Sequence, residues 1–479
     1  MTMLQEKPRA QFARREALPV RRVPGWWSSL TVFLLWALGL FVVALWVSNG
    51  GITGMMTGTA GILNELGRLT GLAASYLLLV QVLGMARIPF VERAFGQDAV
   101  TRGHRITGFW SFWLMLAHIV LITLGYAADT QAGIWGTLVD FTLNYPAMLL
   151  AIAGTLALIM VVVTSLRVAR RRMRYESWHL LHLYAFLGVG LALPHQLWTG
   201  RDFLASPAAT VFWWSLYLGS IGAVLVFRVL KPLIGTLRAG LRVTKVEQLQ
   251  PGVVQVTATG RHAAALQAQG GQYFNWRFAG PGFTRANPYS LSAAPRTHRD
   301  GSTDLRFTAA IVGDGSRRLA TLRPGTRVSV EGPYGKMHAG AATRPGALLL
   351  GAGIGITPLR ALLESLPTDP RTGRLEATIV QRHSDEHDLI LADEIGRIAD
   401  ARGAQYYQLP GHRVRERASW LPEEYAHLAD TEALLLLCPD IVDRDVYVCG
   451  GPGWMDAVAA ALHRLHVPSN QIHIERFAL

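Results

Sequence analysis

Six apolar stretches, each close to the length of a membrane-crossing helix, lie in the first half of this chain of 479 residues. They cover residues 30–47, 69–86, 106–128, 147–166, 181–198 and 210–230. Because about 20 apolar residues are needed to cross a bilayer core as a helix, these stretches predict six transmembrane spans. From about residue 241 onward no apolar run reaches that length, so a soluble α/β half is expected to follow the membrane half.

The composition agrees with a membrane protein. Only 16% of the residues are charged, compared with about 25% in ordinary globular domains, and the shortfall is confined to the first half. The two cysteines, Cys438 and Cys449, exclude a disulfide framework, a four-cysteine iron–sulfur cluster and a cysteine-rich zinc site.

Lysine and arginine predict the orientation of the spans. The N-terminal tail, the 87–105 connection and the 167–178 connection contain six, four and five of them, whereas the opposite connections contain only Arg68 and Arg201. By the positive-inside rule the basic segments, and with them the N-terminus and the soluble half, face the cytoplasm. The net charge of +13 is then explained by topology and contact with the lipid bilayer, without nucleic acid. A multi-pass protein of the cell (plasma) membrane is expected.

Four histidines within the spans are candidate metal ligands, because ionisable residues in a membrane are costly and commonly functional. His104 and His118 are 14 residues apart in the third span, so on an ideal helix they share a face within about 40° and are separated by roughly 21 Å. The fifth span runs in the same direction and contains His182 and His195 at matching levels. Each pair, His104 with His182 and His118 with His195, is suited to hold one haem iron between two imidazoles. Two stacked b-type haems would form an electron path across the bilayer.

The fifth span leaves alternatives open. His182 and His195 are 13 residues apart, which places them about 140° apart around a straight helix, although Pro194 could reorient the end of that helix. His179 competes with His182 for the inner position. The same histidines are also compatible with a proton or metal path.

Residues 241–340 contain short strands separated by Gly and Pro, for example at 252–258, 304–309 and 326–331, which predicts a small antiparallel barrel. Two of its segments could bind a flavin nucleotide: Asn287-Pro288-Tyr289-Ser290 and Gly313-Asp314-Gly315-Ser316. In the first, an aromatic ring can pack on the isoalloxazine and a hydroxyl can bond its N5 edge. In the second, backbone N–H groups of a glycine turn suit a pyrophosphate.

The last part of the chain alternates strand and helix after a Pro/Gly break at 344–346. An apolar strand leads through a glycine-rich turn into a helix start, the context that a dinucleotide requires. The turn reads Gly351-Ala352-Gly353-Ile354-Gly355-Ile356-Thr357-Pro358. A second buried strand ends in Cys449-Gly450-Gly451-Pro452, and a final strand precedes Phe477. Arg382, after the second strand of this domain, is placed to meet a 2′-phosphate, which favours NADPH over NADH.

In this order the segments resemble the ferric reductase/NADPH oxidase superfamily, in which a six-span dihaem membrane domain precedes a ferredoxin–NADP reductase-like module. The resemblance covers about residues 28–479 and depends on the ordered set of motifs. It implies a basic cytoplasmic tail (1–27), a six-helix transmembrane dihaem bundle (28–232), an antiparallel β-barrel FAD domain (240–341) and an α/β NAD(P)H-binding domain (345–479).

The resemblance also implies roles for particular residues. The four histidines match the haem ligands, and Tyr289 and Ser290 match residues at the flavin ring and ribityl chain. The other matches are the FAD pyrophosphate turn (Gly313, Gly315, Ser316), the nicotinamide-nucleotide loop (Gly351, Gly353, Gly355, Thr357, Pro358), the motif beside the hydride-transfer position (Cys449, Gly450, Pro452) and the terminal aromatic over the isoalloxazine (Phe477). Ser290, Cys449 and Phe477 are the candidate catalytic residues.

One position departs from the family pattern. Asn287 stands where the family usually has an Arg or His that bonds the FAD phosphates. Weak or exchangeable FAD is therefore expected, unless Arg285 substitutes.

The resemblance implies an NAD(P)H-dependent transmembrane oxidoreductase. Electrons would pass from cytoplasmic NADPH or NADH through FAD and two b-type haems to an outer acceptor, which could be a ferric chelate, oxygen or a redox protein. Two other functions stay open: a membrane-anchored flavin reductase that serves a partner redox protein, and a non-enzymatic proton or metal transport protein regulated by nucleotide. If the protein is a transport protein, it should show no haem spectrum. If it is an anchored flavin reductase, its membrane histidines should be dispensable.

Overall fold

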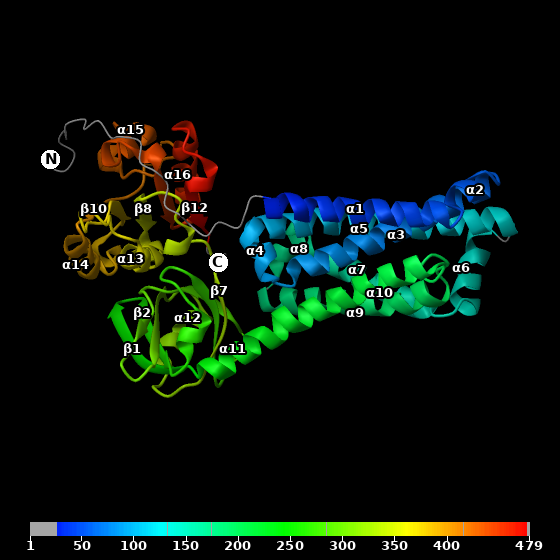
Figure 1. Ribbon diagram of the computed structural model, residues 1–479, viewed down its shortest axis with the longest axis horizontal. Helices are drawn as coiled ribbons and strands as arrows, with labels where there is room; N and C mark the ends of the chain where they lie inside the picture. Colours follow the sequence, from blue (N-terminus) through cyan, green and yellow to red (C-terminus); the bar gives the residue numbers. More distant parts are fainter. Residues whose placement is uncertain (1–25, 132, 174, 284, 415, 477–479) are drawn as a thin grey trace. The chain divides into compact units, whose positions relative to one another are not determined.

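The computed structural model describes residues 26–131, 133–173, 175–283, 285–414 and 416–476. These divide into two compact units, a membrane unit that ends at Leu230 and a soluble unit that begins at Lys231 (Figure 1). Each unit is described by itself below.

Six helices of the described residues are long and apolar enough to cross a membrane, as the hydropathy pattern predicts. Helices suit this environment because they satisfy every backbone hydrogen bond within the segment. The candidate spans are Trp26–Ser48, Thr59–Met85, Ala99–Thr130, Met148–Ser165, Ser177–Trp198 and Pro207–Ala239. They belong to α1 (Trp26–Ser48), α3 (Thr59–Met85), α5 (Gln97–Thr130), α7 (Met148–Ser165), α9 (Tyr175–Trp198) and α10 (Pro207–Ala223) with its continuation. The chain is a multi-pass membrane protein.

Helices α7 and α9 approach closely because two glycines face each other. A Cβ added to Gly154 would lie 2.8 Å from the backbone oxygen of Gly188, so neither position has room for a side chain. Small residues permit such close approaches between membrane helices.

Short helices connect the spans: α2 (Gly51–Met55), α4 (Pro89–Phe95), α6 (Gly133–Asn144) and α8 (Arg167–Arg172). The last span begins at Ser206, whose hydroxyl accepts from the backbone N–H of Ala209 at 3.2 Å and caps α10. It continues through a π-helical segment, Val224–Leu230, into α11 (Lys231–Ala239). In the soluble unit α11 packs on β7 through the Thr236 hydroxyl, which donates to the oxygen of Val330 at 2.9 Å.

The first part of the soluble unit is the antiparallel barrel that the sequence predicts. Its strands are β1 (Arg242–Gln250), β2 (Val253–Gly260), β3 (Tyr273–Phe278), β4 (Asn287–Ser290), β5 (Arg296–Thr297), β6 (Thr303–Ala310) and β7 (Val328–Tyr334). They form two sheets, β1-β2-β6-β5 and β4-β3-β7. Single bridges join the sheets at Leu291–Phe307 and Arg242–Arg327. Phe274, Trp276 and Phe307 fill the core between them.

The second part is a five-stranded parallel sheet with helices on both faces, which confirms the α/β prediction (Figure 1). Its strands, in the order β10-β9-β8-β11-β12, are β10 (Gln405–Leu409), β9 (Ala377–Arg382), β8 (Gly346–Ala352), β11 (Arg444–Cys449) and β12 (Ile472–Glu475). The main helices are α13 (Ile356–Ser365), α14 (Ala392–Arg402), α15 (Asp430–Leu437) and α16 (Pro452–Arg464). Alternate residues of β8 face opposite cores: Leu348 packs in the core that contains α15 and α16, and Leu349 in the core that contains α13 and α14.

Candidate functional site

The two imidazoles of the inner pair of membrane histidines lie next to each other. The ring centroids of His104 on α5 and His182 on α9 are 5.9 Å apart, with the ring planes inclined by 68°. Two imidazoles bound on opposite sides of one metal ion would have centroids about 6 Å apart, given metal–nitrogen bonds of about 2 Å. The separation therefore fits a shared iron. His179 lies beside Trp178, with the ring centroids 6.4 Å apart.

His182 is oriented by two neighbours that the sequence analysis did not single out. The Ser165 hydroxyl lies 3.3 Å from its Nδ1, and the Trp178 ring lies 5.1 Å from its ring. Trp178 also donates from Nε1 to the Ser165 hydroxyl at 3.3 Å. With Nδ1 engaged, Nε2 is the nitrogen that can bind a metal. Only the packing of α7 beside α9 brings these residues together.

The outer pair is His118 and His195. Nδ1 of His118 donates to the backbone oxygen of Gly67 at 2.7 Å, which fixes the tautomer and leaves Nε2 as a lone-pair donor. Gly71 packs on the same ring, because a Cβ there would lie 2.6 Å from Nδ1. The buried Nδ1 of His195 has no hydrogen-bond partner among the described residues.

The two helices that carry these histidines each pack mainly on another helix. Among the described residues, α5 packs along α3 and α9 packs along α7, but α5 and α9 make little backbone contact with each other. The donor set, two imidazoles at each of two levels, suits bis-histidine haem ligation. The residues present therefore fit two haems.

A buried ion-pair network of the membrane unit was missed by the sequence analysis, which assigned Arg68 to a connection. Arg68 lies within α3, and its guanidinium donates to Glu65 at 2.6 Å and to Asp202 at 2.6 Å. Glu65 is 8% exposed and Asp202 5% exposed, and Asn49 also donates to Asp202. The signal available in the sequence was a group of ionisable residues beside apolar spans.

In the barrel, the flavin candidate Tyr289 lies against the core. Its ring stacks on Phe307 with centroids 4.7 Å apart, and burial raises the pKa of its hydroxyl to about 12. The neighbouring Ser290 is buried, and its hydroxyl has no hydrogen-bond partner among the described residues. An unpartnered buried hydroxyl is unfavourable unless a ligand satisfies it. This strand therefore fits a polar ligand atom at Ser290. Pro288 is exposed.

Asn287 and the glycine turn meet in space, although 26 residues separate Asn287 from Gly313 in the sequence. A Cβ on Gly315 would lie 2.8 Å from the Asn287 side-chain oxygen. The Ser316 hydroxyl accepts from the N–H groups of Val312 and Gly313, at 2.9 and 3.0 Å, and so closes the turn that begins α12 (Asp314–Arg317).

The glycine-rich loop and the cysteine turn meet where the strand order of the parallel sheet reverses. Strands β8 and β11 are neighbours with Gly351 opposite Cys449, and sequential strands continue outward from them on both sides. Ligands of such sheets bind at this reversal, outside the carboxyl ends of the strands. A Cβ on Gly355 would lie 2.3 Å from the Cys449 oxygen, so the loop and the turn are in direct backbone contact.

The other candidate residues near the glycine-rich loop and the cysteine turn are mostly buried. Thr357 and Pro358 are buried, and the Thr357 hydroxyl donates to the Ile354 oxygen at 3.0 Å. Pro452 begins α16. Cys449 is fully buried, and burial together with the nearby Glu475 carboxylate raises the pKa of its thiol well above the usual range, which keeps it protonated. Phe477 lies outside the described residues.

Gly355→Ala is expected to destabilise the nucleotide-binding lobe by about 3 kcal/mol, because the new methyl group would overlap the backbone of Cys449. The measurement is thermal unfolding of the purified protein, followed by the release of FAD fluorescence. Gly451→Ala is the matched control, because a Cβ at Gly451 meets nothing within 4 Å. Equal unfolding temperatures for the two variants would contradict the close contact.

The Arg382 side chain is buried and bonds the backbone. It is 4% exposed at the end of β9, and its guanidinium donates to the backbone oxygens of His383 and Leu409. An open cavity of about 610 Å³ lies beside it, at the same edge of the sheet. The cavity is lined by Ser384, His412, Arg413, Val414, Arg417 and Ala418. These residues, four of them polar or basic, follow β9 and β10, and the sequence analysis had not selected them.

Comparison with known proteins assigns each half of the chain. Residues 70–193 match the family model described as ferric reductase like transmembrane component. The soluble half is 28% identical over 249 residues to ferredoxin–NADP reductase B of Sorangium cellulosum, a match that covers 49% of this chain and 96% of the relative. The chain joins a ferric reductase-like transmembrane domain to a ferredoxin–NADP reductase-like module. The resemblance and the oxidoreductase class predicted from the sequence are confirmed.

The reductase module is also similar to other proteins. It is 30% identical over 193 residues to the ferredoxin reductase component of 3-ketosteroid-9-alpha-monooxygenase from Mycobacterium tuberculosis, where the match covers 40% of this chain and 49% of the relative. Among solved structures, the flavohaem-like FAD/NAD-binding domain of nitric oxide dioxygenase from Vibrio cholerae is 21% identical, with a TM-score of 0.38 and coverage of 50% of this chain and 99% of that structure.

Proposed function

We propose that this protein transfers electrons from cytoplasmic NAD(P)H through FAD and two b-type haems to an acceptor on the outer side of the cell membrane. The observation that carries the proposal is the pair His104 and His182, whose ring centroids lie 5.9 Å apart between two helices of a ferric reductase-like domain. An imidazole pair at that separation would suit a haem held by two histidines, which would supply electron transfer and not substrate binding.

The cofactors supply the redox chemistry: the flavin accepts a hydride and releases single electrons, and the haems relay them. The protein holds and orients these groups. His104 with His182 would hold the inner haem and His118 with His195 the outer one, while Ser165 and the Gly67 carbonyl set the tautomers of His182 and His118.

The reductase module would bind FAD along β4 and the turn before α12. Tyr289 would pack on the isoalloxazine, the unpartnered Ser290 hydroxyl would bond its N5 edge, and the turn Gly313–Ser316 would receive the pyrophosphate. The Asn287 side chain lies against that turn, but it offers the phosphates an uncharged amide instead of a cation. FAD that exchanges readily during purification is the expected consequence.

The nucleotide would bind at the reversal point between β8 and β11, on the backbone of Gly353 and Gly355 and beside Cys449 and Gly450. Because Arg382 is engaged with backbone oxygens, we assign recognition of a 2′-phosphate to Arg413 in the neighbouring cavity. Arg413 Nη1 also lies near Gly453, at the start of α16, which brings the cavity toward the cysteine turn. This arrangement favours NADPH.

Arg413→Ala is expected to lower kcat/KM for NADPH by about 10- to 100-fold, since a hydrogen bond to a charged group contributes about 1.5–3 kcal/mol. The value for NADH should stay within about twofold. Steady-state kinetics with both nucleotides gives the ratio of kcat/KM for NADPH to kcat/KM for NADH. Arg464→Ala removes an exposed arginine of the same lobe and should leave the ratio unchanged. An equal loss of kcat/KM with NADH would show that Arg413 has a structural role and does not recognise the 2′-phosphate.

The outer acceptor could be a ferric chelate or oxygen. The direct experiment is an absorbance spectrum of detergent-extracted protein, supplied with FAD, before and after NADPH under anaerobic conditions. Reduced low-spin b-haem bands that require FAD support the proposal, and admission of air or a ferric chelate then identifies the acceptor. Absence of haem bands, in protein expressed with ample haem, would favour an anchored flavin reductase or a nucleotide-regulated transport protein.

A further inference from the structure

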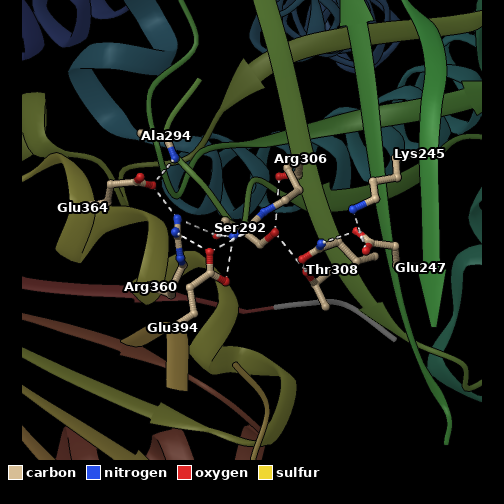
Figure 2. A network of polar contacts seen from close by, with 10 residues as sticks. Lys245, Glu247, Ser292, Ala294, Arg306, Thr308, Arg360, Glu364 and Glu394 are labelled. Carbon is tan, nitrogen blue, oxygen red and sulfur yellow. Dashed lines mark hydrogen bonds and ion pairs between the residues drawn. The ribbon is translucent and has the colours of Figure 1, made fainter. Parts of the chain in front are cut away.

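A continuous set of polar contacts crosses from the barrel to the nucleotide-binding lobe of the soluble unit (Figure 2). It begins at an exposed pair on β1, passes β2 and β6, and ends on α13 and α14. Its members are Lys245, Glu247, Gln255, Ser292, Ala294, Arg306, Thr308, Arg360, Glu364 and Glu394.

The centre of this set is Glu394 on α14, which lies between two arginines from different lobes. Arg306 of β6 approaches it with both terminal nitrogens, at 3.0 and 3.1 Å. Arg360 of α13 donates to it at 2.6 Å. A carboxylate held by two guanidinium groups is a strong and directional contact.

The same arginines hold the segment that follows the flavin strand. The backbone oxygen of Ser292 accepts from Arg306 at 3.1 Å and from Arg360 at 3.3 Å. Glu364, the ion-pair partner of Arg360 on α13, accepts from the backbone N–H of Ala294 at 2.9 Å. The chain just after Ser290 is thus fixed from both lobes.

Burial makes these contacts costly to break. Arg360 is 5% exposed, and Ser292 is fully buried. Burial and the nearby Arg306 cation lower the pKa of Arg360, while Glu364 and Glu394 oppose that shift. Removing one partner of a buried charge pair leaves the other uncompensated. The network therefore resists a change in the relative position of the lobes.

We propose that Arg306, Arg360 and Glu394 act as positioning residues that set the glycine-rich nucleotide loop against the flavin strand. The inference rests on the proposed function. Arg360 is three residues beyond Thr357 on the helix that follows the loop, and Ser292 is two residues beyond Ser290 on the segment that follows β4. Hydride transfer depends steeply on distance between donor and acceptor, so small shifts of one lobe slow it strongly.

The test is Glu394→Gln in the full-length protein loaded with FAD. Stopped-flow absorbance measures flavin reduction at saturating NADPH, and a titration with NADP⁺ measures nucleotide affinity. We expect flavin reduction about 10- to 100-fold slower, with the nucleotide dissociation constant within about twofold of wild type. Lys245→Met is the matched control, because the pair Lys245–Glu247 lies within β1 and joins no lobes.

A second readout is independent of activity. Spin labels at Arg299→Cys on the barrel and Arg371→Cys on the nucleotide-binding lobe report the distance between the lobes, because both positions are exposed and both native cysteines are buried. The distance distribution should be narrow with Glu394 and broad in Glu394→Gln. Arg306→Lys, which keeps the charge but not the two-pronged contact, should broaden it less.

The outcomes are distinguishable. If Glu394→Gln reduces flavin at the wild-type rate, or keeps a narrow distance distribution, the positioning role is overturned while the proposed function stands. If neither NADPH nor NADH reduces the flavin of the wild-type protein, the proposed function itself fails, and the spin-label distances still report whether Glu394 holds the lobes together.

Discussion

Replacement of His118 by alanine is expected to remove one of the two proposed haems and to stop electron transfer to the outer acceptor. The His118 imidazole is fixed by the Gly67 carbonyl at 2.7 Å and by the close approach of Gly71, which holds it in one orientation. A haem that only His195 would hold should be bound weakly. NADPH should still reduce the flavin and the inner haem, because His104 and His182 are untouched.

Haem content per protein, measured as the pyridine complex, and the rate of ferric chelate or oxygen reduction test this prediction. Content should fall by about half, because bis-histidine ligation gives each haem its own pair. His179→Ala is the matched control: His179 lies one turn from His182, and its loss should leave both haems bound. Full haem content in His118→Ala would exclude His118 as a ligand, and loss of haem in His179→Ala would transfer the inner site to His179.

Replacement of Arg68 by methionine is expected to destabilise the membrane unit by about 3–5 kcal/mol. The guanidinium is the cation that Glu65 and Asp202 share, with both carboxylates at 2.6 Å. Breaking a buried pair from one side costs this amount because the remaining charges lose their compensation. An apparent Tm roughly 10 °C lower in detergent is the measurable result, given about 2–4 °C per kcal/mol for a unit of this size.

Two comparisons separate the loss of charge from other effects of that substitution. Asp140→Asn removes the charge of an exposed carboxylate on α6 and should leave the Tm unchanged. The triple variant with Glu65→Gln and Asp202→Asn should recover much of the loss, because it removes the charges that Arg68→Met leaves unpaired. An unchanged Tm in Arg68→Met would show that the network contributes no net stability.

The architecture could be predicted almost completely from the sequence. Hydropathy over about 20 residues located six spans, and alternation with glycine turns located the barrel strands and the parallel sheet. The ends were less accurate: α3 begins at Thr59, ten residues before the expected span, because Glu65 and Arg68 interrupt the apolar run and yet remain helical. Their mutual ion pair permits this.

The types of candidate site could be predicted from the sequence, but not every residue that lines them. The motifs at Tyr289 and Gly355 were visible because they consist of consecutive residues. Arg382 was selected for its position after a strand, but its side chain turns into the protein and bonds backbone oxygens. Arg413 lies in an irregular segment after β10, where no periodic pattern indicates which residues face the cavity.

The sequence by itself determined which segments enter the membrane, how the chain is divided and which motifs it carries, because these depend on the polarity and spacing of neighbouring residues. Only the tertiary structure decided that His182 faces His104, that Asp202 meets Arg68, and that Glu394 joins two arginines from different lobes. Such contacts depend on how helices are rotated and how sheets pack, and residues far apart in the chain reach each other only after both are fixed.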